Sequence, residues 1–198
     1  MKQSKSKHAI LGLLAQGSGS GYDIKKIVEQ KISHFWNESY GQIYPILKDL
    51  AATKLVSRKV ERQTGKPDRQ VYTITARGRA SLDDWLSEPA QFQVLRNETL
   101  LKLFFGHESD TDANLRLIQR YRDYHLQLID GCAELEKELK RDHPGDTDLP
   151  YWLMTIDHCR VEARAVLRWC DVTLKKLADL DEPTRGRKPR ATPVRQRR

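Results

Sequence analysis

Residues 39–50, SYGQIYPILKDL, combine a helical apolar stripe with polar and flat residues on the opposite face. The apolar residues recur at the i, i+3, i+4 and i+7 spacing of one helix face: Ile43, Ile46, Leu47 and Leu50. At about 100° per residue, four residues then point outward: Gly41, Tyr44, Pro45 and Lys48. Further polar groups come from Ser39, Tyr40 and Gln42. Such a low-profile polar face suits hydrogen bonds to phosphates and to base edges in the major groove of DNA.

A different interpretation of this segment is a surface helix with an incidental proline. Pro45 removes one backbone hydrogen bond, so it predicts a bend in the helix or a start delayed beyond a Ser39 cap. The segment alone does not decide between the two interpretations. The basic hairpin expected after it favours the groove-binding one.

Two short helices are expected before this segment. The first ends at GSGSG, a loop by composition, and its apolar face comprises Ile10, Leu11, Leu13 and Leu14. Ser20 and Asp23 have the spacing of a capping box and start the second helix. The apolar face of the second helix comprises Ile24, Ile27 and Val28. Three short helices are therefore predicted in a row.

A hairpin and a fourth helix follow. LVSRKV and QVYTI are β-prone runs, and Gly65 and Pro67 mark the turn between them. Three residues make the turn basic: Arg62, Lys66 and Arg69. Thr75 is expected to cap a helix with a buried face of Leu82, Trp85 and Leu86. This order of elements is that of a winged helix-turn-helix, and SEPAQF breaks the pattern near Pro89.

The second half of the chain is helical by pattern. A short helix is expected from Asn97 to Phe105, followed by a helix with Ser109 and Asp112 as a capping-box variant. Its seam comprises Ile118, Tyr121, His125, Leu128, Cys132, Leu135 and Leu139. A last helix opens at Pro150, and its seam comprises Trp152, Ile156, Cys159, Ala163, Val166, Cys170, Thr173 and Leu177. The apolar surface beside it favours a dimer over a plain hairpin: Leu153, Leu167 and Leu174.

Charge divides the chain into three parts. Residues 1–88 hold 15 Lys/Arg against 9 Asp/Glu, residues 89–180 hold 13 against 16, and residues 181–198 hold 7 against 2. A basic front half indicates a polyanion partner. We therefore expect a DNA-binding domain over 1–88, a helical dimerisation and effector domain over 89–180, and a disordered basic tail over 181–198.

Several classes of protein are disfavoured. No stretch approaches the roughly 18 apolar residues of a membrane span, and the polar start MKQSKSKHAI lacks a signal core, so a soluble cytoplasmic protein is expected. The sequence has no G-x-S-x-G, H-E-x-x-H, Walker or Rossmann motif, and GSGSGYD follows a helix and not a strand. We expect neither an enzyme nor a cofactor.

The cysteines and histidines leave alternatives open. Cys132, Cys159 and Cys170 lack C-x-x-C spacing, so buried structural thiols are favoured over redox sensing. His125 and His158 could join nearby cysteines in a metal site, but packed core residues are favoured and no metal is expected. Aromatic residues could line an effector pocket or serve as packing: Trp36, Trp85, Trp152, Trp169, Tyr121, Tyr124 and Tyr151.

Three segments resemble the PadR-type transcriptional regulators. They are LGLLAQGSGSGYDI, with Gly21, Tyr22 and Asp23; GQIYPILKDL, close to that family's Tyr-Pro-x-Leu signature; and GKPDRQVYTITARGRASLDDWL. The resemblance covers about residues 8–87. The helical second half is similar to the family's dimerisation domain. One departure is Lys54, where the family commonly has a glycine after the recognition helix.

The resemblance implies a homodimeric regulator, usually a repressor, that binds a palindromic operator in double-stranded DNA and releases it when a small molecule binds. Candidate DNA contacts on the second and third helices are Tyr22, Ser39, Tyr40, Gln42, Tyr44 and Lys48. On the wing they are Lys66 and Arg69. The effector and its pocket residues are unknown. A helical adaptor protein and a thiol-responsive regulator stand as alternatives.

Overall fold

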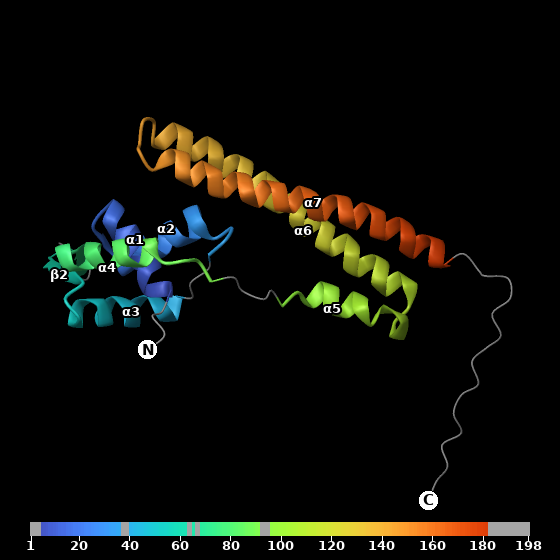
Figure 1. Ribbon diagram of the computed structural model, residues 1–198, viewed down its shortest axis with the longest axis horizontal. Coiled ribbons are helices and arrows are strands. Elements are labelled where there is room, and N and C mark those ends of the chain that lie inside the picture. Colours follow the sequence, from blue (N-terminus) through green and yellow to red (C-terminus); the bar gives the residue numbers. More distant parts are fainter. Residues whose placement is uncertain (1–4, 37–39, 63–64, 66–67, 92–95, 182–198) are drawn as a thin grey trace, which may run out of the picture. The chain divides into compact units, whose positions relative to one another are not determined.

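The computed structural model is mainly helical, with one small antiparallel sheet (Figure 1). It describes residues 5–36, 40–62, 65, 68–91 and 96–181. Ser39, Lys66 and the basic tail therefore lie outside the described residues. Contacts within the chain group it into two compact units. One comprises Met1–Val94 and Gly131–Cys159, and the other comprises Leu95–Asp130 and Arg160–Arg198.

Four helices of the first unit enclose one hydrophobic core. They are α1 (Lys5–Gln16), α2 (Gly21–Ile27) with its π-helical continuation η1 (Val28–Ile32), α3 (Tyr40–Ala52) and α4 (Ala76–Ser87). The apolar faces predicted for the first three helices are confirmed, because all their residues are buried or partly buried. In α4, Leu82 is buried and Trp85 packs on the core. Leu86 is 65% exposed, so its predicted burial is wrong: it lies in the last turn of α4 and lines a surface cavity.

The sheet has three strands in the order β1, β3, β2. β2 (Val56–Glu61) and β3 (Arg69–Ile74) form the predicted hairpin, with Val56 opposite Ile74, and Gly65 between them has a positive φ of 76°. β1 (Gly19–Ser20) pairs with β3 and lies inside the segment expected to be a loop. A two-residue strand is too short to give an alternating pattern, so its partner strand alone defines it.

The predicted capping box at the start of α2 is confirmed. The Ser20 hydroxyl accepts a hydrogen bond from the Asp23 backbone N–H at 3.3 Å. The Asp23 carboxylate accepts one from the Ser20 backbone N–H at 2.7 Å. Two N–H groups that the helix itself cannot satisfy thus have partners. Ser20 belongs to β1 as well, so this residue joins the sheet to α2.

The end of α3 is a tight turn with Lys54 in the left-handed conformation, at a φ of 60°. The Leu55 N–H donates to the Leu50 carbonyl at 2.9 Å, and the Lys54 N–H donates to the Ala51 carbonyl at 3.1 Å. These two bonds form a Schellman motif, whose left-handed position glycine usually occupies. The helix therefore ends in a motif that favours glycine, but Lys54 adopts a conformation unfavourable for a residue with a Cβ.

The same turn meets the start of α4. Thr75 caps α4 as predicted, because its side chain accepts from the Gly78 N–H at 3.1 Å. The Thr75 N–H and hydroxyl both lie 3.0 Å from the Leu55 carbonyl oxygen. A Cβ on Gly78 would lie only 2.1 Å from that oxygen. Position 78 therefore requires glycine for close approach of the two backbones.

The remaining elements are α5 (Glu98–Phe104), the 3₁₀ turn η2 (Gly106–Glu108), α6 (Thr111–Asp142) and α7 (Leu149–Asp181). Asn97 caps α5, accepting from the Leu100 N–H at 3.1 Å. The start of α6 differs from the prediction: Asp110, not Ser109, accepts from the Ala113 N–H at 2.5 Å. Asp110 directly precedes Thr111, the first residue of α6, so its carboxylate reaches the N–H groups of the first turn.

Helices α6 and α7 lie side by side, and their predicted seams are confirmed because every seam residue is buried or partly buried (Figure 1). In the second unit, Ile118 packs with Cys170 and Leu177. In the first unit, Cys132 faces Cys159. Among the described residues, no helix is both long and apolar enough to cross a membrane.

Lys54→Gly is expected to stabilise the protein by about 0.5–1 kcal/mol, raising Tm by roughly 1–4 °C. Glycine removes the cost of a left-handed lysine, which outweighs its greater entropy in the unfolded chain. Thermal unfolding followed by circular dichroism measures the change. Ala52→Gly, inside the last turn of α3, is the control and should lower Tm. Equal losses in both variants would contradict the interpretation.

Candidate nucleic-acid interface

Helix α3 presents the face that the sequence predicts. Ile43, Leu47 and Leu50 are buried, with exposed fractions of 1% or less. The four residues predicted to point outward are exposed: Gly41, Tyr44, Pro45 and Lys48. Gln42, a further candidate contact, is exposed as well. Tyr40 is the first residue of α3, and its side chain is not described. Tyr44, Gln42 and Lys48 thus leave a hydroxyl, an amide and an ammonium group exposed on α3.

The two unusual residues of α3, Gly41 and Pro45, are both exposed. Among the described residues, no atom lies within 4 Å of a Cβ added to Gly41, so the described part of the fold does not require a glycine there. Helix α3 runs continuously from Tyr40 through Pro45 to Ala52, so the proline does not delay its start. A glycine costs a helix roughly 0.5–1 kcal/mol relative to alanine. An open, flat and exposed helix face is therefore maintained at some loss of stability.

Tyr44 joins this face to helix α2. Its side chain is 45% exposed, yet a Cβ added to Gly21 would lie 2.7 Å from Cε1 of the Tyr44 ring. Gly21 thus permits the ring to lie against the first turn of α2. Tyr22, the neighbouring candidate, is 62% exposed. Tyr22 on α2 and Tyr44 on α3 are thus both exposed, and the ring of Tyr44 lies against the start of α2.

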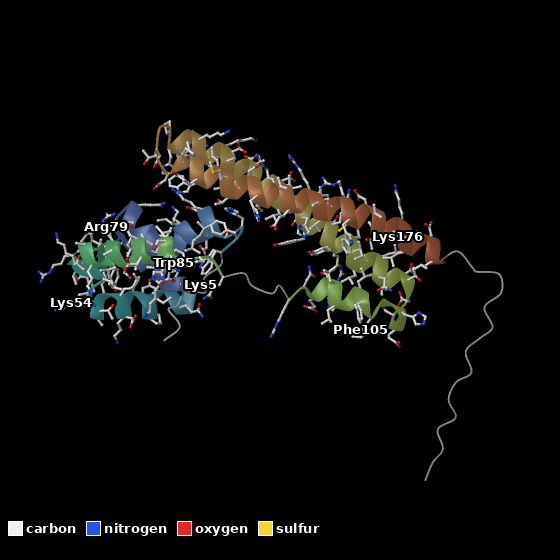
Figure 2. All side chains as sticks on the ribbon, in the orientation of Figure 1. Lys5, Lys54, Arg79, Trp85, Phe105 and Lys176 are labelled. Carbon is white, nitrogen blue, oxygen red and sulfur yellow. The ribbon has the colours of Figure 1, made fainter. Side chains whose placement is uncertain are left out.

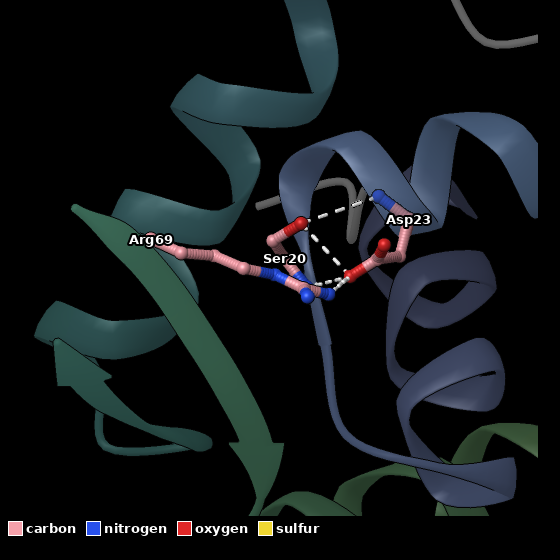
Figure 3. A network of polar contacts seen from close by, with 3 residues as sticks. All are labelled: Ser20, Asp23 and Arg69. Carbon is pink, nitrogen blue, oxygen red and sulfur yellow. Dashed lines mark hydrogen bonds and ion pairs between the residues drawn. The ribbon is translucent and has the colours of Figure 1, made fainter. Parts of the chain in front are cut away.

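The wing is tied to α2 by an ion pair (Figure 3). The Arg69 guanidinium at the start of β3 contacts the Asp23 carboxylate, which also accepts from the Ser20 backbone N–H and from the Ser20 hydroxyl at 2.8 Å. Arg69 thus has a partner within the protein, and its predicted contact with phosphate stays a prediction. Sequence reasoning did not single out the neighbouring basic residues Arg58 and Lys59, which are exposed on β2. Their position in a basic strand of the predicted hairpin could have identified them as candidate DNA contacts.

The pKa of Asp23 lies below the ordinary aspartate value. Burial acts to raise it, but the Ser20 backbone and side-chain hydrogen bonds and the Arg69 charge outweigh burial and lower it. Because the folded-state pKa is depressed, the resulting stabilisation is present above the unfolded pKa. It is lost as pH falls through the folded pKa.

A cavity of about 560 Å³ lies in the first unit, away from the outward face of α3. Its lining is aromatic on several sides: Phe35, Trp36, Trp85 and Trp152. Ionisable and polar lining residues include Lys5, His8, Arg79 and Asp148. Figure 2 labels Lys5, Arg79 and Trp85 on the helices that carry them. Of the other aromatic candidates, Trp169 and Tyr121 pack in the second unit, and Tyr124 and Tyr151 are exposed.

His8 is the most unusual residue of this cavity. Its side chain is only 4% exposed and stacks on Trp85, with ring centroids 4.9 Å apart. Among the residues that the structure describes, its Nδ1 atom has no hydrogen-bond partner. Burial lowers the His8 pKa, which Glu88 partly opposes. A buried nitrogen without a partner costs free energy, so it is available to a ligand that supplies the missing hydrogen bond.

Two families match the chain. The Transcriptional regulator PadR-like family matches residues 10–84, and the family Virulence activator alpha C-term matches residues 95–178. The chain belongs to the PadR-like family of transcriptional regulators. Its winged helix-turn-helix and its pair of long helices are the two matched regions.

Known proteins agree with this assignment. The negative transcriptional regulator PadR of Bacillus subtilis is 36% identical over 100 residues, which are 50% of this chain and 55% of that protein. The chain spans about half the length of the curated relatives that it matches. The crystal structure of B. subtilis PadR with operator DNA has a TM-score of 0.78, with 23% identity, covering 88% of this chain and 99% of that one. The complex of the same protein with p-coumaric acid has a TM-score of 0.69, with 22% identity and 87% and 94% coverage.

The PadR-like family is one of regulators and not of enzymes, in keeping with the lack of catalytic motifs in the sequence. Across the described ranges of this family member, no three His, Cys, Asp or Glu side chains form a group that could hold a metal ion. His125 packs edge-on against Tyr121, with ring centroids 4.6 Å apart, and His158 is exposed on α7.

Asp23→Asn is expected to lower the free energy of unfolding by about 1 kcal/mol at neutral pH, because it weakens the helix cap and the pair with Arg69. The difference from wild type should shrink as pH falls through the lowered folded-state pKa of Asp23, because protonation removes the same contribution. Urea unfolding over a series of pH values measures it. Asp83→Asn, at an exposed site on α4, is the control. A difference independent of pH would contradict this explanation.

Proposed function

We propose that the chain is a sequence-specific DNA-binding regulator whose helix α3 enters the major groove. The observation that carries the proposal is the outward face of α3, where Gly41 lies in open space beside exposed Gln42, Tyr44 and Lys48. A flat face lets the helix backbone approach base edges, and the polar neighbours make the contacts. The complex of B. subtilis PadR with operator DNA supports this role.

The remaining predicted contacts complete the proposed interface. Tyr22, together with Ser39 and Tyr40 at the start of the third helix, would contact the groove or its edges. Lys66, on the wing, would contact a DNA phosphate. We add Arg58 and Lys59, which are exposed on β2 of the same hairpin. Arg69 would act mainly through Asp23, holding β3 against the start of α2. The +6 charge of residues 1–88 supports a polyanion partner.

We further propose a homodimer, with residues 1–88 binding DNA and residues 89–180 providing the dimer contacts. Four large apolar side chains on or beside α5 support it, with exposed fractions between 46% and 81%: Leu100, Leu101, Phe104 and Phe105. An exposed apolar cluster on so short a helix is typical of a surface covered by another chain. Two-fold symmetry would require a palindromic operator.

The regulator is proposed to be a repressor released by a planar aromatic acid. The negative regulation and p-coumaric acid complex of the B. subtilis relative support both parts. In this chain the cavity around His8 has the matching chemistry. Trp36, Trp85 and Trp152 offer aromatic faces, and Lys5 and Arg79 offer cations for a carboxylate.

DNA binding is tested with the full-length chain and the DNA flanking its own coding region. In about 0.15 M salt, we expect that fragment to bind roughly a thousandfold more tightly than random DNA of equal length. Fluorescence anisotropy measures both affinities. Equal affinity for the two DNAs would refute sequence-specific regulation, and an affinity insensitive to salt would favour the adaptor alternative.

Gly41→Ala should separate stability from DNA binding. The added methyl group faces open space, so helix stability should rise by up to about 1 kcal/mol, while operator affinity falls at least about tenfold because α3 cannot approach as closely. Gly131→Ala is the matched control: it lies in α6, also with open space around it, and should be stabilising with unchanged operator affinity. Unchanged operator affinity in Gly41→Ala would remove this face from the interface.

Effector binding is tested by calorimetric titration with p-coumaric acid. Arg79→Ala should weaken binding by about ten- to a hundredfold, through loss of a charge-assisted hydrogen bond to the carboxylate. Arg77→Ala is the control, because Arg77 is exposed on the same helix but does not line the cavity. Absence of binding to the wild-type chain, or equal losses in both variants, would rule out the proposed site.

A further inference from the structure

Two cysteines face one another where helices α6 and α7 pack in the first unit. The Cys132 thiol points at the Cys159 sulfur, with the two Sγ atoms 3.3 Å apart. The residues are 27 positions apart and only 2% and 6% exposed. Their approach therefore results from the pairing of the two helix seams.

This geometry is close to that of a disulfide. A disulfide has its sulfur atoms about 2.05 Å apart, so the two Sγ atoms would need to approach by only about 1.3 Å. The other buried cysteine has different surroundings, because Cys170 packs with Ile118 and Leu177. Within the described residues no group of three or more metal-ligating side chains includes the pair, so metal binding is a poorer explanation.

We propose that Cys132 and Cys159 are an oxidation site that closes to an intramolecular disulfide when a peroxide reacts with the chain. The peroxide oxidises one thiol to a sulfenic acid: a sulfur–oxygen bond forms, the oxygen–oxygen bond breaks and one water leaves. The second thiol attacks that sulfur, forming the disulfide and releasing a second water. Two thiols lose two hydrogens and two electrons, which reduce one peroxide to two waters.

The disulfide would restrain the segment that contacts the DNA-binding helices. The chain segment between the two cysteines contains His143, just after α6, and Trp152, in α7. The Lys31 Nζ atom at the end of η1 lies 2.9 Å from His143 Nε2 and 4.8 Å from the centre of the Trp152 ring. Oxidation would thus tie together the ends of the α6–α7 segment that carries both contacts with η1. Because both thiols are buried, the reaction requires local opening and is slow compared with that of an exposed thiolate.

The test exposes the full-length chain to hydrogen peroxide, unfolds it, alkylates the remaining thiols and determines its mass. We expect the number of alkylated thiols to fall from three to one, with a peptide linking Cys132 to Cys159. Tm should rise by roughly 5–10 °C and return to its starting value with a thiol reductant. Both readouts are independent of DNA binding, so they stand or fall separately from the proposed function.

Cys170→Ala is the matched control, since it removes a buried cysteine outside the pair and should leave the cross-link intact. Cys159→Ala and Cys132→Ala should each abolish the cross-link and the reversible rise in Tm. Circular dichroism of the reduced variants checks that they fold. Each of four outcomes would overturn the proposal: three alkylated thiols after oxidation, a cross-link to Cys170, a link between two chains, or thiols oxidised only to acids.

Discussion

The carbonyl oxygen of Leu55 is the point on which the geometry of the first unit depends. It accepts hydrogen bonds from Thr75, and the bare Cα of Gly78 passes close beside it. The end of α3, the start of β2 and the start of α4 therefore meet within one turn. Because Thr75 caps α4 and also bonds Leu55, the direction of α4 and the position of the wing follow from how α3 ends.

Two further contacts place the wing and α3 relative to α2. The Asp23 carboxylate connects the α2 cap to Arg69 on β3, and the ring of Tyr44 lies against Gly21. Both contacts involve the first turn of α2, so its capping box serves more than helix stability. An exposed ion pair alone contributes little, but this one shares its carboxylate with two hydrogen bonds from Ser20.

Local patterns in the sequence predicted the helices, the hairpin and the caps at Ser20 and Thr75, because each depends on residues within one or two turns. They failed where a distant partner decides the outcome. β1 exists only through pairing with β3, and the exposure of Leu86 depends on where the core ends. The candidate groove face followed from helix periodicity, whereas the cavity around His8 combines α1, η1, α4 and the start of α7 and has no local signature.

The aromatic lining of that cavity has an optical consequence. The chain has four tryptophans, and Trp36, Trp85 and Trp152 all line this one cavity. Indole emission depends on the polarity and the quenching groups around each ring, and here Trp85 stacks on an imidazole while Trp152 lies under an ammonium group. Three of the four indole fluorophores of the protein therefore lie at a single place. The unlabelled chain carries its own spectroscopic reporter of whatever enters or leaves that space.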